Sequence, residues 1–275
     1  MTFALFLLVG TACSTAHPAQ PTKQATASVD SKPQAPTPEQ SVAQAQAACT
    51  AGDMLDCTNL GLAYENGVGV VKDEARAAAL YQQACNGGDM IDCSNLGLLY
   101  VAGKGVPKDP AKAAALYAQS CSGGNMWGCC NLGRLYERGL GVDRDLRRAA
   151  ALFEQACTGG DMLGCVNLGM NYDKGEGVPT NRAKAQALYQ QACTGGDMLG
   201  CSNLGACYMR ATGTTKDAAR AARLFLQACD GGAMSGCANL GHAYQLGEGV
   251  ALDPAKASAL FQQACNGGYS EACAK

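Results

Sequence analysis

The chain has 275 residues, and its 21 basic and 23 acidic side chains give a formal net charge of -2 and an isoelectric point of about 5.7. Without a basic field, neither nucleic acid nor an anionic lipid surface is an expected partner. The 17 cysteines occur with only two histidines, His17 and His242, and without any Cys-x2-Cys pair, so zinc ligation is disfavoured. Disulfides formed in an oxidising compartment explain the cysteines better, and no metal or other cofactor is expected.

The N-terminus has the composition of an export signal. Residues 3–9 form an apolar run that is too short to cross a bilayer, which predicts a signal peptide over residues 1–12. The small residues before Cys13 resemble the bacterial lipoprotein signal, and this resemblance implies a lipid on Cys13, with Ser14 favouring the outer membrane. The alternative is an ordinary cleaved signal that leaves Cys13 unmodified.

A polar, proline-rich segment follows from residue 13 to residue 37. It contains Pro18, Pro21, Pro33 and Pro36 and shows no apolar period, which is typical of a disordered tether. Such a tether would hold the following domain roughly 25–30 Å from its anchor. Contact with a membrane is expected through the lipid alone.

In the remaining chain, residues 38–275, one cysteine motif occurs seven times. One cysteine recurs every 36 residues, and each has a partner eight residues further along the chain. The pairs are Cys49 and Cys57, Cys85 and Cys93, Cys121 and Cys129, Cys157 and Cys165, Cys193 and Cys201, Cys229 and Cys237, and Cys265 and Cys273. A strict period of this length predicts a repeat architecture in which each unit buries its apolar surface against its neighbours.

Residues 89–124 illustrate how one unit predicts two helices. Asp89 is a helix N-cap residue, and the apolar positions after it recur at helical spacing until Gly103 ends the first helix. The second helix begins near Asp109 with Pro110 at its first position, where a missing N–H costs nothing.

The predicted fold is therefore all-α: an α-solenoid of six helix pairs that we treat as one continuous domain. The repeats are residues 53–88, 89–124, 125–160, 161–196, 197–232 and 233–268, with capping segments at 38–52 and 269–275. The first cap contains a lone helix, from about Pro38 to Cys49, that corresponds to the second helix of a unit. The last cap contains the start of a helix, from Tyr269 to Lys275, that corresponds to the first helix of a unit.

The spacing of eight also predicts the disulfide pairing. One cysteine lies in the last turn of a second helix, and its partner lies near the first turn of the next helix, across a short Gly-Gly-Asp turn. The two antiparallel helices place the sulfurs opposite each other, so each bridge should link one helix hairpin to the next.

The pattern Asn-Leu-Gly-x-x-Tyr, followed by Gly-x-Gly-Val and Ala-x-x-Leu-Tyr, is similar to the Sel1-like repeat, a relative of tetratricopeptide repeats. The added cysteine pairs resemble the Helicobacter cysteine-rich protein family. This resemblance implies a secreted or periplasmic location and an adaptor role in protein assembly. It also implies an alternative, a penicillin-binding protein with weak β-lactamase activity.

The residues themselves favour a scaffold over an enzyme. The sequence contains no Ser-x-x-Lys, Ser-Asp-Asn or Lys-Thr-Gly motif, on which the established serine β-lactamases depend. No catalytic residue can be named. We therefore expect an exported monomer, periplasmic or anchored to the outer membrane, or alternatively secreted, that binds a protein or peptidoglycan-related partner in the cell envelope.

One asparagine in every first helix is the candidate binding feature. The set is Asn59, Asn95, Asn131, Asn167, Asn203 and Asn239. The amides could form a ladder that binds an extended peptide or glycan, or each amide could bond to a neighbouring backbone group where glycine lets the helices approach. The recurrent tyrosine five residues later is expected in the core.

Three residues depart from the repeat. Cys130 and Cys207 lie outside the paired motif and are either small buried apolar residues or groups with a redox or intermolecular role. His242 occupies a variable position and is expected on a helix surface.

Overall fold

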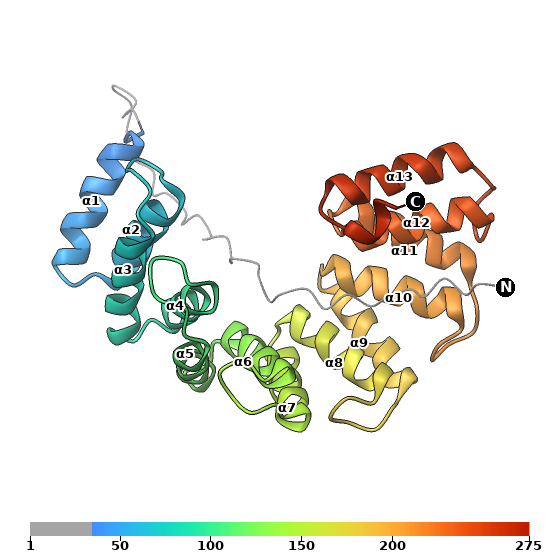
Figure 1. Cartoon of the computed structure of the whole chain (residues 1–275), viewed down its shortest axis with the longest axis horizontal. Helices are drawn as coiled ribbons and strands as arrows, with labels where there is room; N and C mark the ends of the chain where they lie inside the picture. Colours follow the sequence, from blue (N-terminus) through green and yellow to red (C-terminus); the bar gives the residue numbers. More distant parts are fainter. Residues whose placement is uncertain (1–34, 275) are drawn as a thin grey trace, which may run out of the picture. The chain divides into compact units, whose positions relative to one another are not determined.

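The computed structural model describes residues 35–274, which form thirteen α-helices and a short 3-10 helix and contain no strand (Figure 1). We name the first helix of each pair the A helix and the second the B helix. The A helices are α2 (Met54–Asn66), α4 (Met90–Ala102), α6 (Met126–Arg138), α8 (Met162–Lys174), α10 (Met198–Arg210) and α12 (Met234–Leu246). The B helices are α1 (Pro38–Thr50), α3 (Glu74–Asn86), α5 (Pro110–Ser122), α7 (Leu146–Thr158), α9 (Arg182–Thr194), α11 (Ala218–Asp230) and α13 (Pro254–Asn266). The all-α prediction is confirmed, whereas the signal peptide and Cys13 lie outside the described residues.

The described chain forms two compact units. The N-terminal unit runs to Gly128 and includes Leu140–Val142, and the C-terminal unit comprises Cys129–Gly139 and the chain from Asp143. Within the units, a B helix packs between its own A helix and the next one, as α3 does between α2 and α4 and as α11 does between α10 and α12. No described helix is both long and apolar enough to cross a membrane.

The predicted caps set the helix boundaries. The Asp89 carboxylate accepts hydrogen bonds from the N–H groups of Ile91 (2.8 Å) and Asp92 (3.2 Å), which no earlier carbonyl of the helix could satisfy. The helix then ends at Gly103, whose φ of 71° lies in the left-handed region. Carboxylates cap eight other helices in the same way, whereas Thr37 and Asn181 cap α1 and α9 and α12 has no side-chain cap. The eight are Asp53, Asp73, Asp109, Asp145, Asp161, Asp197, Asp217 and Asp253.

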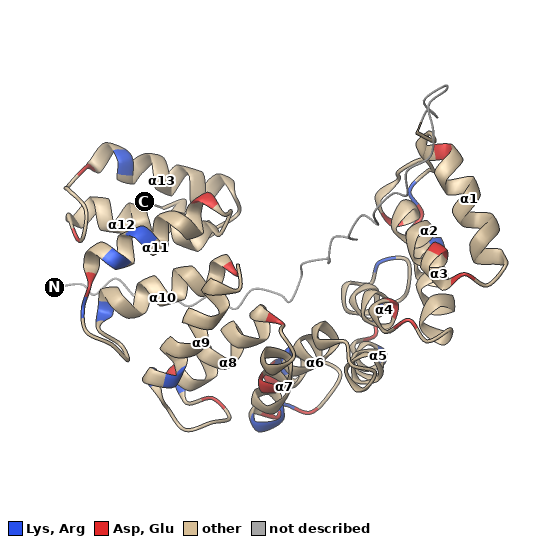
Figure 2. Ribbon diagram, turned by 180° about the vertical axis from the view of Figure 1, so that it is seen from behind, with Lys and Arg blue, Asp and Glu red and all other residues tan. Residues whose placement is uncertain are grey.

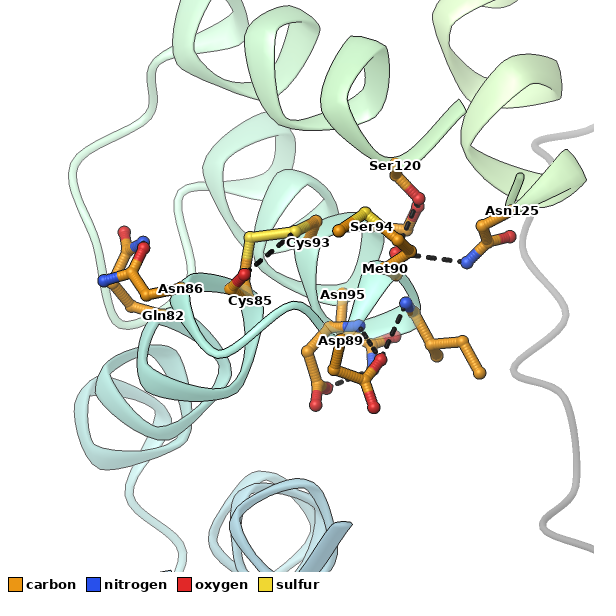
Figure 3. Close-up of a disulfide and its surroundings, with 12 residues drawn as sticks. Gln82, Cys85, Asn86, Asp89, Met90, Cys93, Ser94, Asn95, Ser120 and Asn125 are labelled. Carbon is orange, nitrogen blue, oxygen red and sulfur yellow. Dashed lines mark hydrogen bonds between the residues drawn. A yellow bond between two sulfur atoms is a disulfide. The ribbon is translucent and has the colours of Figure 1, made fainter. Parts of the chain in front are cut away.

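A disulfide crosses the tight turn between a B helix and the next A helix. After α3, Gly88 adopts a φ of 97° and the Asp89 N–H donates to the Ala84 carbonyl over 3.0 Å, so α4 starts directly beside the end of α3. This brings the Cα atoms of Cys85 and Cys93 within 4.7 Å, and their sulfurs are bonded (Figure 3).

The same bridge recurs along the chain with Cα separations from 4.4 to 4.8 Å. The further pairs are Cys49–Cys57, Cys157–Cys165, Cys193–Cys201, Cys229–Cys237 and Cys265–Cys273. This confirms that one disulfide joins successive helix hairpins.

The core repeats one contact between an aromatic ring and a glycine. Each B helix from α3 onward buries one tyrosine or phenylalanine: Tyr81, Tyr117, Phe153, Tyr189, Phe225 and Phe261. The ring lies on the glycine of the Asn-Leu-Gly sequence in the preceding A helix. A Cβ atom built on Gly97 would lie only 2.7 Å from Cε1 of Tyr117, so the ring can occupy this place because Gly97 has no side chain.

The C-terminal cap differs from the prediction. The segment expected to form the first turns of an A helix is instead a 3-10 helix, Ser270–Ala272. Its closing hydrogen bond runs from the Cys273 N–H to the Ser270 carbonyl over 3.1 Å, a separation of three residues rather than four. The Cys265–Cys273 disulfide ties this turn to α13.

We predict that Gly97→Ala destabilises the protein by about 1–3 kcal/mol, because the added methyl group would overpack the ring of Tyr117. Urea unfolding followed by circular dichroism measures this change. Since a glycine-to-alanine change in an unobstructed helix stabilises by roughly 0.5–1 kcal/mol, an increase in stability would contradict the proposed packing.

We also predict that the paired substitution Cys193→Ala and Cys201→Ala lowers the free energy of unfolding by about 2.5 kcal/mol, because the unfolded chain loses a small closed loop. The experiment compares urea unfolding of the oxidised variant and the oxidised native protein. Unchanged stability would show that this bridge does not constrain the unfolded chain.

Candidate interaction surface

Four apolar side chains of the N-terminal unit share one face of the A helices. Leu55 and Leu62 lie on α2, and Ile91 and Leu98 lie at the equivalent positions of α4, 36 residues later. The spacing of seven within each helix is two turns, so each pair lies on the same side of its helix. We call these four residues the A row.

The A row is open to solvent at its N-terminal end. Leu55 is 67% exposed and Ile91 is 50% exposed, while Leu62 and Leu98 are half-buried. Exposed apolar residues that recur in register on neighbouring helices can contact one partner together. Lys and Arg instead gather at the starts of the B helices and the adjoining loops, as in the ion pairs Arg76–Asp73 and Lys112–Asp109 (Figure 2).

The candidate asparagines lie between the apolar positions of this face, and three of them already have partners within the array. The Asn95 amide donates to the carboxylate of Asp92 (2.9 Å), that of Asn167 to Cys130 Sγ (3.4 Å), and that of Asn239 to Ser202 Oγ (3.3 Å). The last two bonds join successive A helices, which favours a structural role for these amides.

The other three asparagines differ in their surroundings. Asn59 is exposed, Asn203 is half-buried, and Asn131 is buried with no hydrogen-bond acceptor for its Nδ2 among the described residues. A ladder of six equivalent ligand-binding amides therefore stays a prediction, and Asn59 is its most accessible member.

Asp92 is a buried acid behind the A row. It is completely shielded from solvent on α4, where its carboxylate accepts hydrogen bonds from the Thr58 hydroxyl of α2 and from Asn95. Burial raises the pKa of Asp92 to about 6, and the bonds from Thr58 and Asn95 oppose this rise only in part. The group therefore links two A helices and retains its proton to a higher pH than an exposed aspartate does.

The surroundings of the disulfides contain buried serines rather than reactive ones. Figure 3 shows Ser94 and Ser120 facing each other beside the Cys85–Cys93 bridge, with their oxygens 2.7 Å apart. Ser120 Oγ donates to the Met90 carbonyl over 2.5 Å, and Asn125 donates to the same carbonyl over 3.1 Å. Both serines are completely buried, so a soluble substrate cannot reach them.

The recurrent tyrosines of the A helices were expected in the core, but they take part in a contact that the sequence reading missed. Each is capped by a basic side chain twelve residues later, at the third position of the B helix. The pairs are Tyr64–Arg76, Tyr100–Lys112, Tyr136–Arg148, Tyr172–Lys184, Tyr208–Arg220 and Tyr244–Lys256, with the charge 4.3 to 5.5 Å from the ring centre. A basic residue three after each B-helix cap is the sequence signal, and the contact joins the two helices of a pair.

The residues that break the repeat are also packed. Cys207 is a free thiol that is buried in α10, and burial raises its pKa, which disfavours the reactive thiolate. Cys130 is fully buried, and His242 is half-buried with its ring 4.9 Å from that of Phe261. No cluster of His, Cys, Asp or Glu that could hold a metal ion occurs within residues 35–274.

A family model for the Sel1 repeat matches six segments of the chain. They are residues 56–89, 93–125, 128–161, 163–197, 199–232 and 235–269. The six matches follow the six predicted repeats, shifted by a few residues. No curated protein matches the chain in sequence.

Solved structures give the same picture of the fold. A protective antigen present in uropathogenic Escherichia coli strains is 29% identical with a TM-score of 0.71, over 84% of this chain and 50% of the antigen. The chain thus spans half the length of that relative. A Sel1 repeat protein from Oxalobacter formigenes is 23% identical with a TM-score of 0.73, over 82% of this chain and 96% of that protein.

The cysteine-rich protein B of Helicobacter pylori is 30% identical, with a TM-score of 0.39, over 48% of this chain and 94% of that protein. The family match and the similarity to the Escherichia coli antigen confirm the resemblance to the Sel1-like repeat found in the sequence.

We predict that Asp92→Asn stabilises the protein at pH 8 by about 3 kcal/mol and has little effect below pH 4. The pKa of Asp92 is higher in the folded protein than in the unfolded chain, so this carboxyl contributes most to the free energy of unfolding at low pH. The contribution is lost as the pH rises through about 6. Urea unfolding of both proteins between pH 4 and pH 8 measures the difference.

Asp56→Asn is the matched control, because Asp56 occupies the same position 36 residues earlier but is only half-buried. If the gain in the free energy of unfolding for Asp92→Asn does not grow with pH, the raised pKa of the buried Asp92 carboxyl is wrong.

Proposed function

Because the chain belongs to the Sel1 repeat family, we propose that it is an exported, disulfide-stabilised scaffold that binds another protein through its A helices. Proteins built from Sel1 repeats generally mediate protein–protein interactions, and stacked helix pairs offer an extended surface for this purpose. The proposal depends on one observation above all, the exposure of Leu55 and Ile91 in register on neighbouring A helices.

The A row supports a partner with an apolar contact surface. Burying an exposed leucine and an exposed isoleucine together removes a substantial apolar area from water, and such side chains commonly anchor an interface. The amide of Asn59 lies four residues after Leu55 on the same helix and is exposed, so it can add a directional hydrogen bond at the edge of the contact.

The disulfides indicate an oxidising compartment outside the cytoplasm, because thiols in a reducing cytosol stay unpaired. Within that compartment, we propose a periplasmic protein tethered to the outer membrane through a lipid on Cys13. The support comes from the apolar run and small residues before Cys13 in the sequence. The partner would then be a protein or a peptidoglycan-related component of the envelope.

Hydrolysis of β-lactams, the alternative drawn from the resemblance, is not favoured by any contact among residues 35–274. Ser94 and Ser120 are buried beside a disulfide, and Ser202 accepts hydrogen bonds from Ser235 and Asn239. A scaffold that binds a partner without chemistry accounts for these observations.

We predict that the double substitution Leu55→Asp and Ile91→Asp reduces capture of the native partner at least fivefold, because each carboxylate would have to be desolvated at the interface. The measurement is a quantitative pull-down from envelope extract with the oxidised protein as bait. The partner is defined as a protein retained by the native bait and absent from a bait-free control.

Leu252→Asp is the matched control, since Leu252 is 64% exposed in a loop of the C-terminal unit. If the control weakens capture as much as the double variant, or if no protein depends on the A row, the proposed binding surface is wrong.

A further inference from the structure

The first helix of the array lacks a neighbour that the equivalent helices have. The B helices α3, α9 and α11 each pack against an A helix on both sides, whereas among the described residues α1 packs against α2, the A helix that follows it (Figure 1). No A helix precedes α1 in the described chain. Its side facing away from the array is therefore the place that an A helix occupies everywhere else.

A cavity marks this place. It has a volume of about 280 Å³ and lies between α1 and α2. Its lining comprises Pro36, Pro38, Ser41, Val42, Ala45, Asn59, Leu60, Ala63 and Val68, none of which is charged. A neutral, mostly apolar lining of this size suits a large apolar side chain rather than an ion or a sugar.

The sequence of α1 explains why the cavity exists. Ala45 lies 36 residues before Tyr81, at the position where every later B helix buries an aromatic ring. Ser41 is exposed and Val42 is half-buried, although the corresponding Ala77 and Ala78 of α3 are buried. Without the ring and without the covering helix, the equivalent space stays open.

The α2 side of the cavity points to the same missing element. Asn167 and Asn239 donate hydrogen bonds to Cys130 and Ser202, which lie on the preceding A helix. Asn59 is the equivalent residue of α2, and it is exposed in the lining of the cavity. An acceptor on a helix seated in the cavity would complete this bond.

We propose that the α1–α2 groove binds an amphipathic α-helix of another protein, which takes the place of the missing A helix. The later repeats show how such a helix would pack, because Tyr81 and Phe225 each lie against an A helix at the place that corresponds to the groove. The helix carries a large apolar side chain where the A helices have glycine, since Ala45 leaves room for it. Three residues earlier it carries a hydrogen-bond acceptor for Asn59, as Ser202 precedes Gly205 in α10.

The chain's own preceding segment lacks this chemistry. Residues 14–36 contain four prolines, Pro18, Pro21, Pro33 and Pro36, and no Asn-Leu-Gly-x-x-Tyr sequence. Residues 14–36 therefore do not supply the helix, which we assign to another polypeptide. This binding site shares Asn59 with the edge of the proposed A-row contact but includes none of the four A-row residues, and it does not depend on the function proposed above.

The test uses the oxidised full chain and two fluorescent peptides that are stapled on their solvent side to hold them helical. One has the sequence of residues 89–103 with Cys93→Ala, and the other also carries Gly97→Leu. Both retain Ser94 as the acceptor for Asn59. We expect the Gly97→Leu peptide to bind the native protein at least tenfold more tightly in fluorescence anisotropy, because its leucine fills the space beside Ala45.

Ala45→Phe should reverse this preference, because the ring fills the cavity and only the glycine peptide can then approach it. Ala47→Phe is the matched control: Ala47 is exposed on the same helix, so this variant should behave like the native protein. Val42→Asp should weaken both peptides at least tenfold, and the melting temperature of each variant verifies that it is folded.

Equal affinity of the two peptides, an unchanged preference in Ala45→Phe, or no binding of either peptide would overturn the proposal. Self-association of the native chain that Ala45→Phe abolishes would assign the groove to a second copy and overturn it as well. The groove that binds the peptides includes neither Leu55 nor Ile91 of the full chain. Peptide binding can therefore fail while partner capture through the A row succeeds, and the reverse also holds.

Discussion

The disulfide across each turn between a B helix and the next A helix is the constraint on which the rest of the array depends. Gly88 and the Asp89 cap turn the chain within a few residues, and the Cys85–Cys93 bond holds the two helices beside each other at that point. The core offers few large side chains to do this, since each B helix from α3 onward buries one aromatic ring, and many of the other buried residues are alanines. Covalent bonds therefore supplement modest apolar burial, a common solution in exported proteins.

The close approach of the helices also decides which side chains remain available for binding. Glycine and alanine at the A–B contacts let the two helices approach closely, and the aromatic rings of the B helices pack into this contact. Cation–π contacts such as Arg76 on Tyr64 also join the two helices of a pair. Leu55 and Ile91, two of the apolar side chains left outside this packing, are separated by the period of the repeat. The period that stabilises the fold thus also sets the spacing of the candidate contacts.

The features that could be predicted from the sequence are those that depend on residues close together in the chain. The helix caps at Asp89 and Asp109 and the pairing of Cys85 with Cys93 each involve at most eight intervening positions, so spacing alone indicates them. Contacts between repeats were not predictable in this way. The burial of Asp92 depends on Thr58, 34 residues earlier, and the open groove beside Ala45 is apparent only when α1 is compared with the later B helices.

The most direct test of the account is to map the disulfides in protein purified from its native host. Trypsin separates the seven cysteine pairs, because Lys and Arg occur between successive pairs and never between two cysteines eight apart. After denaturing alkylation without reductant, each tryptic peptide should retain its pair as an internal disulfide, and reduction should then allow both cysteines of that pair to be alkylated. Peptides already alkylated at both cysteines, or peptides linked across different repeats, would contradict the account.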